Sequence, residues 1–258
     1  MYKTSVESMV HTALSKKEAM RQSWLRYFMS SWLAGAYVGI GIVLINIVGA
    51  PFFAEHSPAY NLVMGVSFGI ALTLVIFAGA ELFTGANMYF AISTLERRTS
   101  VGDLLKNWGT VWLGNLVGAL ILCALVVGGG IFKDIPPDHL LFTVASKKMN
   151  LSALEIFCRG ILCNWLVCLS IWTASRAKED TAKLILIWWC LYAFISSGYE
   201  HSVANMTVLS LAVMLPTHPE TVSIAGWFHN MIPATLGNIV GGALFMGMMY
   251  WFVSNKSK

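Results

Sequence analysis

Long stretches of apolar residues dominate the chain, and few charged residues interrupt them. The segments 27–54 and 107–132 carry no charged residue, and the segment 221–255 carries none apart from His229, which can become charged. A helix needs about 20 apolar residues to cross the hydrocarbon core of a bilayer. These stretches are therefore long enough to cross a membrane, and they are too long to be buried helices of a soluble domain.

This pattern predicts an all-α integral membrane protein with six transmembrane helices. The second and fifth spans are longer than one crossing requires. Glu81 lies in the second, and Glu200 and His201 lie in the fifth. An ionisable side chain at membrane depth is costly and marks a functional position by default. We therefore expect both helices to be interrupted. The predicted spans are 27–49, 59–95, 107–131, 153–175, 184–215 and 226–253.

The polar segment 1–26 precedes the first predicted span. Basic residues interrupt it, so it lacks the apolar core of a signal peptide. Its apolar residues recur at helical spacing, which predicts a cytoplasmic amphipathic helix lying on the membrane surface; a solvated tail is the alternative. The remainder, 27–258, is expected to form a single transmembrane channel domain. The apolar residues of the helix are Val6, Met9, Val10, Ala13 and Leu14.

Composition agrees with a membrane environment and argues against several functions. Of the 258 residues, 57% are hydrophobic and 12% are charged, about half the charged fraction of a soluble domain. The net charge of +4 is spread over loops, so nucleic acid is not an expected partner. We find no motif for catalysis, a cofactor or a metal. The cysteines fall in apolar runs and are interpreted as small buried residues: Cys123, Cys158, Cys163, Cys168 and Cys190.

Basic residues predict which side of the membrane each loop faces. They concentrate in the N-terminal segment, in the loops after the second and fourth spans, and at the C-terminus. Because cytoplasmic loops are enriched in Lys and Arg, both termini are predicted to be cytoplasmic. This side carries Lys3, Lys16, Lys17, Arg21, Arg26, Arg97, Arg98, Lys106, Arg176, Lys178, Lys183, Lys256 and Lys258, and the other carries Lys133, Lys147 and Lys148, with Arg159 just inside the fourth span.

Short motifs recur in the two halves of the chain in the same order. Their offsets are 123, 118 and 125 residues. Each half has three predicted spans, an odd number, so the halves must have opposite orientations in the membrane. We therefore predict two inverted three-helix repeats, at about 27–131 and 153–253. The matching motifs are LGNLVG at 113–118 with LGNIVG at 236–241, ANM at 86–88 with ANM at 204–206, and Gly35 with Gly160.

The predicted interruptions, at 81–85 and 198–202, occupy matching places. Each contains a glycine and a hydroxyl residue suited to cap the following helix, Thr84 and Ser202. Non-helical backbone at this depth is tolerated only where protein buries it or where it lines a wet cavity. The following helices would direct free N–H groups and a positive dipole end at the midplane. Such a site favours an anion; a simple kink without a pore is the alternative.

The residues at these interruptions resemble a known family. AELFTG at 80–85 and SGYEHSVANM at 197–206 resemble the two signatures of the formate/nitrite transporter family, and LGN at 113–115 and 236–238 fits its third and sixth helices. The segments CNWLVC at 163–168 and 187–206 are most similar to its nitrite and hydrosulfide branch. The resemblance implies an aquaporin-like protomer, a homopentamer in the bacterial inner (cytoplasmic) membrane with one pore per protomer, and passage of formate, nitrite or hydrosulfide.

The resemblance also implies roles for individual residues. His201 is implied to be the pore histidine, with Thr84 facing it and Asn164 beside it. Lys148 is similar to a basic residue that draws anions to the outer vestibule; a solvated loop charge is the alternative. Without the resemblance, five apolar residues near the interruptions would be interpreted as core packing: Phe68, Leu72, Leu82, Phe83 and Phe194. The resemblance implies an outer constriction at Phe68 and Phe194 and an inner one at Leu72, Leu82 and Val167.

A histidine on a helix interruption can serve an anion in two ways. The His201 ring can donate a hydrogen bond to it and can exchange a proton with a weak acid in transit; a satisfied core histidine is the alternative. Glu81 and Glu200 could conduct protons or repel a second anion. We favour a structural role for both, in which they accept hydrogen bonds from the free N–H groups of the interrupted helices.

These observations predict a passive, selective channel for small monovalent weak-acid anions. The resemblance favours hydrosulfide, with formate and nitrite also permeant, although the residues themselves do not choose among the three. The main alternative is a proton-coupled formate/nitrite symporter with His201 as the proton relay. A channel for neutral solutes and a scaffold without transport are two further alternatives. The direction of transport and the gate are not predicted.

Overall fold

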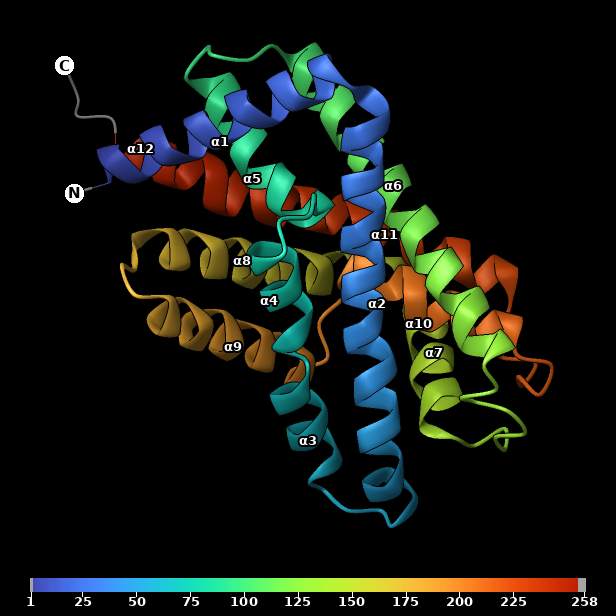
Figure 1. The fold of residues 1–258 in the computed structure, drawn as a ribbon. Coiled ribbons are helices and arrows are strands. Elements are labelled where there is room, and N and C mark those ends of the chain that lie inside the picture. The colour runs from blue at the N-terminus through green and yellow to red at the C-terminus, as the bar shows by residue number, and fades with distance from the viewer. Residues whose placement is uncertain (1, 255–258) are drawn as a thin grey trace.

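The computed structural model describes residues 2–254, and most of them are helical (Figure 1). This confirms the all-α class. Five helical stretches are long and apolar enough to cross a membrane: Trp24–Ala54, Tyr60–Phe77, Val101–Gly128, Ala153–Arg176 and Ile224–Ser254. Lys256 and Lys258, which contributed to the predicted orientation, lie outside the described residues.

The described residues form the following helices in chain order. They are α1 (Lys3–Gln22), α2 (Trp24–Ala54), α3 (Tyr60–Ser67), α4 (Ile70–Phe77), α5 (Phe83–Leu95), α6 (Val101–Gly128), α7 (Leu140–Asn150), α8 (Ala153–Arg176), α9 (Asp180–Ser196), α10 (Ser202–Met214), α11 (Ile224–Ile239), a π-helix (Val240–Met248) and α12 (Met249–Ser254).

Glycines allow the long helices to pack with their backbones in contact. A Cβ atom on Gly35 of α2 would lie 2.0 Å from the carbonyl oxygen of Asn115 on α6. In the other half, a Cβ atom on Gly237 of α11 would lie 2.2 Å from the carbonyl oxygen of Phe157 on α8. No side chain fits at such distances. Close approach through small residues is typical of helices that pack inside a membrane.

The N-terminal helix α1 lies across one end of the molecule, beside α12 and the end of α5 (Figure 1). Val6, Met9, Val10 and Ala13 are buried against the protein. This apolar face therefore packs against the other helices of the chain, and the position of α1 on the membrane surface stays a prediction. The interpretation of the cysteines as buried residues needs a correction, because Cys158 is exposed on the surface of the chain.

Two short non-helical segments lie between consecutive helices. Residues 78–82 separate α4 from α5, and residues 197–201 separate α9 from α10. The backbone turns at Gly79 (φ 76°) and Gly198 (φ 68°), in the left-handed region that favours glycine. The first non-helical segment therefore begins at residue 78, before the interruption predicted at 81–85. Gly85, which was predicted to lie in that interruption, is inside α5.

Candidate functional site

The first turns of α5 and α10 meet through Thr84 and His201. The hydroxyl oxygen of Thr84 lies 3.2 Å from Nε2 of His201, and both residues are buried. The other ring nitrogen, Nδ1, accepts a hydrogen bond from the backbone N–H of Ala204 at 3.0 Å. A neutral imidazole carries one proton. That proton must therefore reside on Nε2, which directs a donor towards the start of α5.

This geometry corrects the predicted helix caps. His201, and not Ser202, is the N-cap of α10, and Leu82 occupies the same position at α5 without a side-chain hydrogen bond. Thr84 lies in the first turn of α5, where its hydroxyl is free to face His201. The Ser202 hydroxyl has no hydrogen-bond partner among the described residues.

A buried asparagine on α6 holds the segment that leads into α5. Asn115 Oδ1 accepts the backbone N–H of Phe83 at 3.0 Å. Its Nδ2 donates to the carbonyl oxygens of Ser31 at 2.7 Å and Glu81 at 2.9 Å. One side chain thus satisfies the N–H of Phe83 and the carbonyl of Glu81, which lack helical partners at the start of α5, and it also ties them to the Ser31 carbonyl inside α2.

Asn238 on α11 repeats this arrangement in the second half. Its Oδ1 accepts the N–H of Ser202 at 2.8 Å, and its Nδ2 donates to the carbonyl oxygens of Gly160 and Glu200, each at 2.8 Å. Sequence reasoning recognised the repeated LGN motif but assigned its asparagines no role in the site. One signal could have identified them. An amide side chain, which both donates and accepts hydrogen bonds, occurs at the same position of the LGN motif in both apolar repeats.

The two glutamates contact side chains instead of the free backbone N–H groups. Glu81 accepts hydrogen bonds from Lys16 on α1 and from the Tyr27 hydroxyl at 3.0 Å. Glu200 accepts from Lys148 on α7 at 2.9 Å and from Asn205 at 2.6 Å. The predicted hydrogen-bond partners of the glutamates are therefore wrong, because the asparagines take the backbone groups; whether the role of the glutamates is structural stays a prediction.

The two lysine–glutamate pairs correspond to each other in the two halves. Lys148 lies on a helix and is partly buried, so it is not a solvated loop charge. Lys16 pairs with Glu81 in the first half as Lys148 pairs with Glu200 in the second. Lys16 was not predicted as a site residue, because the sequence analysis assigned its segment to the membrane surface. Tyr27 was missed as well; its hydroxyl accepts a hydrogen bond from Asn107 at 2.7 Å.

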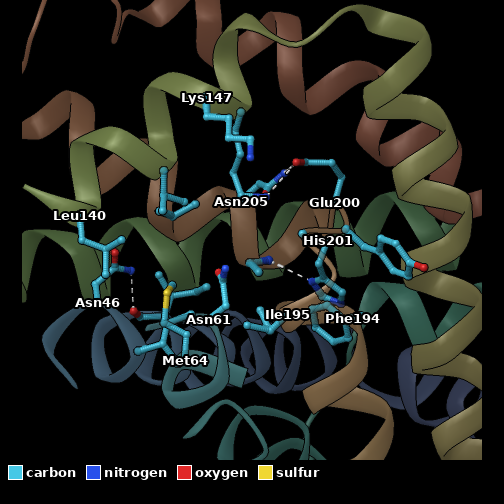
Figure 2. Close-up of a pocket in the computed structure, with 18 of the residues that line it drawn as sticks. Asn46, Asn61, Met64, Leu140, Lys147, Phe194, Ile195, Glu200, His201 and Asn205 are labelled. Carbon is cyan, nitrogen blue, oxygen red and sulfur yellow. Dashed lines mark hydrogen bonds and ion pairs between the residues drawn. The ribbon is translucent and has the colours of Figure 1, made fainter. Parts of the chain in front are cut away.

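Three adjoining cavities lie along the side chains described above. The first, called here the Lys148 cavity, has a volume of about 150 Å³. Lys147, Lys148 and Arg159 line it, together with Glu200 and His201. Figure 2 shows Glu200 and His201 at one side of this space, with Glu200 joined to Asn205 by a hydrogen bond. Three cationic side chains around one carboxylate make this cavity positive, which favours the entry of anions.

The second, called the central cavity, has a volume of only about 10 Å³ and an apolar lining. That is room for about one water molecule at most. The Phe194 ring packs edge-on against Phe68 at 5.5 Å and stacks on the His201 ring at 5.7 Å. The structure thus brings the five predicted constriction residues and His201 around one narrow space: Phe68, Leu72, Leu82, Val167, Phe194 and His201.

The third, called the Lys16 cavity, has a volume of about 240 Å³ and is lined by Lys16, Glu81 and Tyr89 among others. It shares Leu72 and Leu82 with the central cavity, which shares Phe194 and His201 with the Lys148 cavity. The three spaces are therefore arranged in series. Two wider chambers, each with a partly buried lysine–glutamate pair, are separated by a narrow apolar passage beside His201.

Asn164 contacts the other side of Thr84. Its Nδ2 donates to the carbonyl oxygen of Asn238 at 2.6 Å and to that of Thr84 at 3.2 Å. Asn164 thus supports the residue that faces His201, and its link to the histidine runs through Thr84. It lines none of the three cavities described.

Comparison with known proteins places this architecture in a family. The model for "Formate/nitrite transporter" matches residues 3–252. The chain belongs to the formate/nitrite transporter family. The nitrite transporter NirC of Escherichia coli (strain K12) is 47% identical over 234 residues, which cover 90% of this chain and 85% of the relative. The formate channel FocA of the same organism is 30% identical over 247 residues, covering 89% and 86%.

Solved structures of this family have the same fold. A structure described as an FNT family ion channel superposes with a TM-score of 0.92 at 42% sequence identity, covering 98% of this chain and all of the other. A pentameric formate channel with formate bound superposes with a TM-score of 0.79 at 28% identity, covering 92% of this chain. Like its relatives in the formate/nitrite transporter family, the chain is a multi-pass membrane protein.

Proposed function

We propose that this protein is a passive, selective channel for small monovalent weak-acid anions. The observation that carries the proposal is the series of three cavities, in which two lysine-lined chambers meet at a narrow apolar passage beside His201 and Thr84. The positive charge of the Lys148 cavity concentrates anions at the entrance to this passage. An apolar passage excludes hydrated ions, and the histidine donor compensates an anion for the water that it loses there.

We further propose six spans in two inverted repeats. Neither α9, with 17 residues, nor α10, with 13, is long enough to cross alone. Together they would form one interrupted span, and α3, α4 and α5 would form another. The segments 78–82 and 197–201 then lie at membrane depth, where the amides of Asn115 and Asn238 satisfy their backbone. From the distribution of basic residues, we also propose that both termini lie in the cytoplasm of a bacterial inner membrane and that Lys148 lies on the periplasmic side.

Formate, nitrite and hydrosulfide are the anions that we propose. Each is small, monovalent and in equilibrium with a neutral acid, and relatives of this chain are described as nitrite and formate transporters. Resemblance to the nitrite and hydrosulfide branch favours hydrosulfide. The alternative is a proton-coupled symporter, supported by the proton that His201 holds on Nε2 facing the passage.

Electrical recording of the purified protein in planar bilayers tests this proposal. A single-anion gradient of formate, nitrite or hydrosulfide should produce a current that reverses near the equilibrium potential of that anion. The order of the three permeabilities would identify the preferred anion. An electroneutral symporter would instead acidify the receiving compartment without passing current, and that result would contradict the channel.

We expect the protein to assemble as a homopentamer. Gly-rich helix surfaces suit close packing in a membrane, and a family relative is described as a pentameric formate channel. Native mass spectrometry from a mild detergent should show five copies of the 28.3 kDa chain. A monomer that retains anion transport after reconstitution would contradict this expectation.

Lys148→Gln should reduce anion conductance by roughly tenfold at low ionic strength, because its positive charge raises the local anion concentration. The effect should shrink at physiological salt, where charges are screened over about 8 Å. Lys133→Gln, at an exposed loop lysine outside the cavity, is the control. If Lys148→Gln and the parent have equal conductance at low salt, Lys148 does not attract anions, and its role is limited to the ion pair with Glu200.

Phe194→Ala and Leu82→Ala should each admit anions larger than formate, since both side chains narrow the central cavity. We expect acetate permeability relative to formate to rise by about tenfold. Liposome flux assays with both anions would measure this ratio. Phe228→Ala, at an exposed phenylalanine of α11, is the control. If the acetate-to-formate permeability ratio is unchanged in correctly assembled variants, Phe194 and Leu82 only pack the core and do not limit the size of the permeating anion.

A further inference from the structure

The helix that carries Phe68 is interrupted a second time, at Phe68 itself. Helix α3 ends at Ser67 and α4 begins at Ile70. The matching region of the second half shows no such interruption, because α9 is continuous over Asp180–Ser196. Sharp bends in helices have identifiable causes, usually a proline or a group that inserts into the hydrogen-bond ladder. There is no proline between Tyr60 and Phe77, but Ser67 and Gly69 flank Phe68 and weaken the helix there, and a side chain of a neighbouring helix reaches this point.

Trp188 on α9 is that side chain. Its indole Nε1–H donates to the carbonyl oxygen of Val66 at 2.8 Å. Val66 lies in the last turn of α3, where carbonyl groups lack a partner within the helix. The indole ring also covers Gly69, where a Cβ atom would lie 2.5 Å from Trp188 Cδ1. Trp188 therefore contacts the chain on both sides of Phe68.

The bend determines where the Phe68 ring lies. Phe68 is 1% exposed, and its ring packs edge-on against Phe194 at 5.5 Å. Phe194 in turn stacks on His201 with an interplanar angle of 14°. Phe68 and Gly69 keep helical dihedral angles, and the Phe68 carbonyl accepts the N–H of Ala71, three residues on, so the interruption is a tightened turn. A regular α-helical turn at 66–70 would rotate the Phe68 side chain relative to α3, because a tightened turn has about 3.0 residues and an α-helical turn about 3.6.

We propose that Trp188 is a positioning residue, which holds the bend at Phe68–Gly69 and thereby sets the width of the passage between Phe68 and Phe194. The role in selectivity rests on the proposed channel function. The role in positioning Phe68 does not, because it concerns the resting geometry of the chain. Without the indole N–H, the Val66 carbonyl can be satisfied by a backbone N–H only if α3 continues into α4, and that change displaces Phe68.

The test compares Trp188→Phe with Trp189→Phe. The first keeps an aromatic ring and removes the N–H donor; the second changes the adjacent, more exposed tryptophan, for which no hydrogen bond is seen in the described residues. Trp188→Phe should raise the acetate-to-formate permeability ratio by about tenfold in liposomes, and Trp189→Phe should leave it unchanged. In a Phe68→Ala background, Trp188→Phe should have no further effect, since the side chain that it positions is absent.

A second measurement does not depend on transport. With 4-fluorophenylalanine at position 68, the ¹⁹F resonance of the protein in nanodiscs should shift or broaden in Trp188→Phe and not in Trp189→Phe. An unchanged resonance in Trp188→Phe would overturn the proposal. The proposal would also be overturned if Trp188→Phe changed the acetate-to-formate permeability ratio equally in the parent and in the Phe68→Ala background. If the parent passes no anion, the channel function fails, and the ¹⁹F result still decides whether Trp188 positions Phe68.

Discussion

His201→Phe is expected to reduce anion flux by roughly 5- to 150-fold while the oligomer stays assembled. Phenylalanine keeps a planar ring that can stack on Phe194 as the imidazole does, but it has no donor. An anion that has lost water at the passage would meet no side-chain proton from this position. An unmet polar contact costs about 1–3 kcal/mol, which corresponds to that range of rates. Flux into liposomes, measured alongside the oligomer mass, gives the result.

His201→Asn separates hydrogen bonding from proton exchange. The amide still donates, so part of the flux should remain, but it cannot titrate as an imidazole does. If His201 exchanges protons with the permeating acid, only the parent should change its flux with pH through titration at this position. His201→Phe conducting like the parent at every pH would make His201 a core histidine and refute this mechanism.

Asn238→Leu is expected to destabilise the protein and abolish most of the anion flux. The substitution leaves the N–H of Ser202 and the carbonyls of Gly160 and Glu200 without the partner that they have now. Each buried group left unsatisfied costs about 1–3 kcal/mol. Because Ser202 follows His201 directly, the imidazole should also lose its position opposite Thr84. The midpoint of thermal unfolding in detergent and the flux in liposomes measure the two effects.

Asn238→Asp is the matched variant for this prediction. It keeps the acceptor for Ser202 but loses both donors, and a carboxylate there would face two carbonyl oxygens. We expect it to assemble poorly or to conduct little. Asn115→Leu should destabilise the protein in the same way through the first repeat. A midpoint equal to that of the parent in all three variants would show that these amides do not hold the interruptions.

Much of the architecture follows from the order of residues alone. Uncharged stretches of about 20 residues are unambiguous, because water and hydrocarbon distinguish them by several kcal/mol per polar group. The recurrence of the LGN motif at a constant offset predicted the repeat, and family resemblance selected the residues that surround the central cavity. These inferences use local composition and spacing, which a linear sequence displays directly.

The sequence did not reveal how the side chains pair. Glu81 and Lys16 are 65 residues apart, and Glu200 and Lys148 are 52 apart, so no local pattern joins them. Thr84 and Ser202 have the chemistry of caps, yet His201 takes that role because packing places its ring over the N–H of Ala204. Likewise, Trp188 meets the carbonyl of Val66 only once α9 lies beside α3.

The sequence by itself determined which segments are long and apolar enough to cross a membrane, because hydrophobicity is a property of each segment. Only the tertiary structure decided which polar groups satisfy one another there, because every such choice depends on distances between helices.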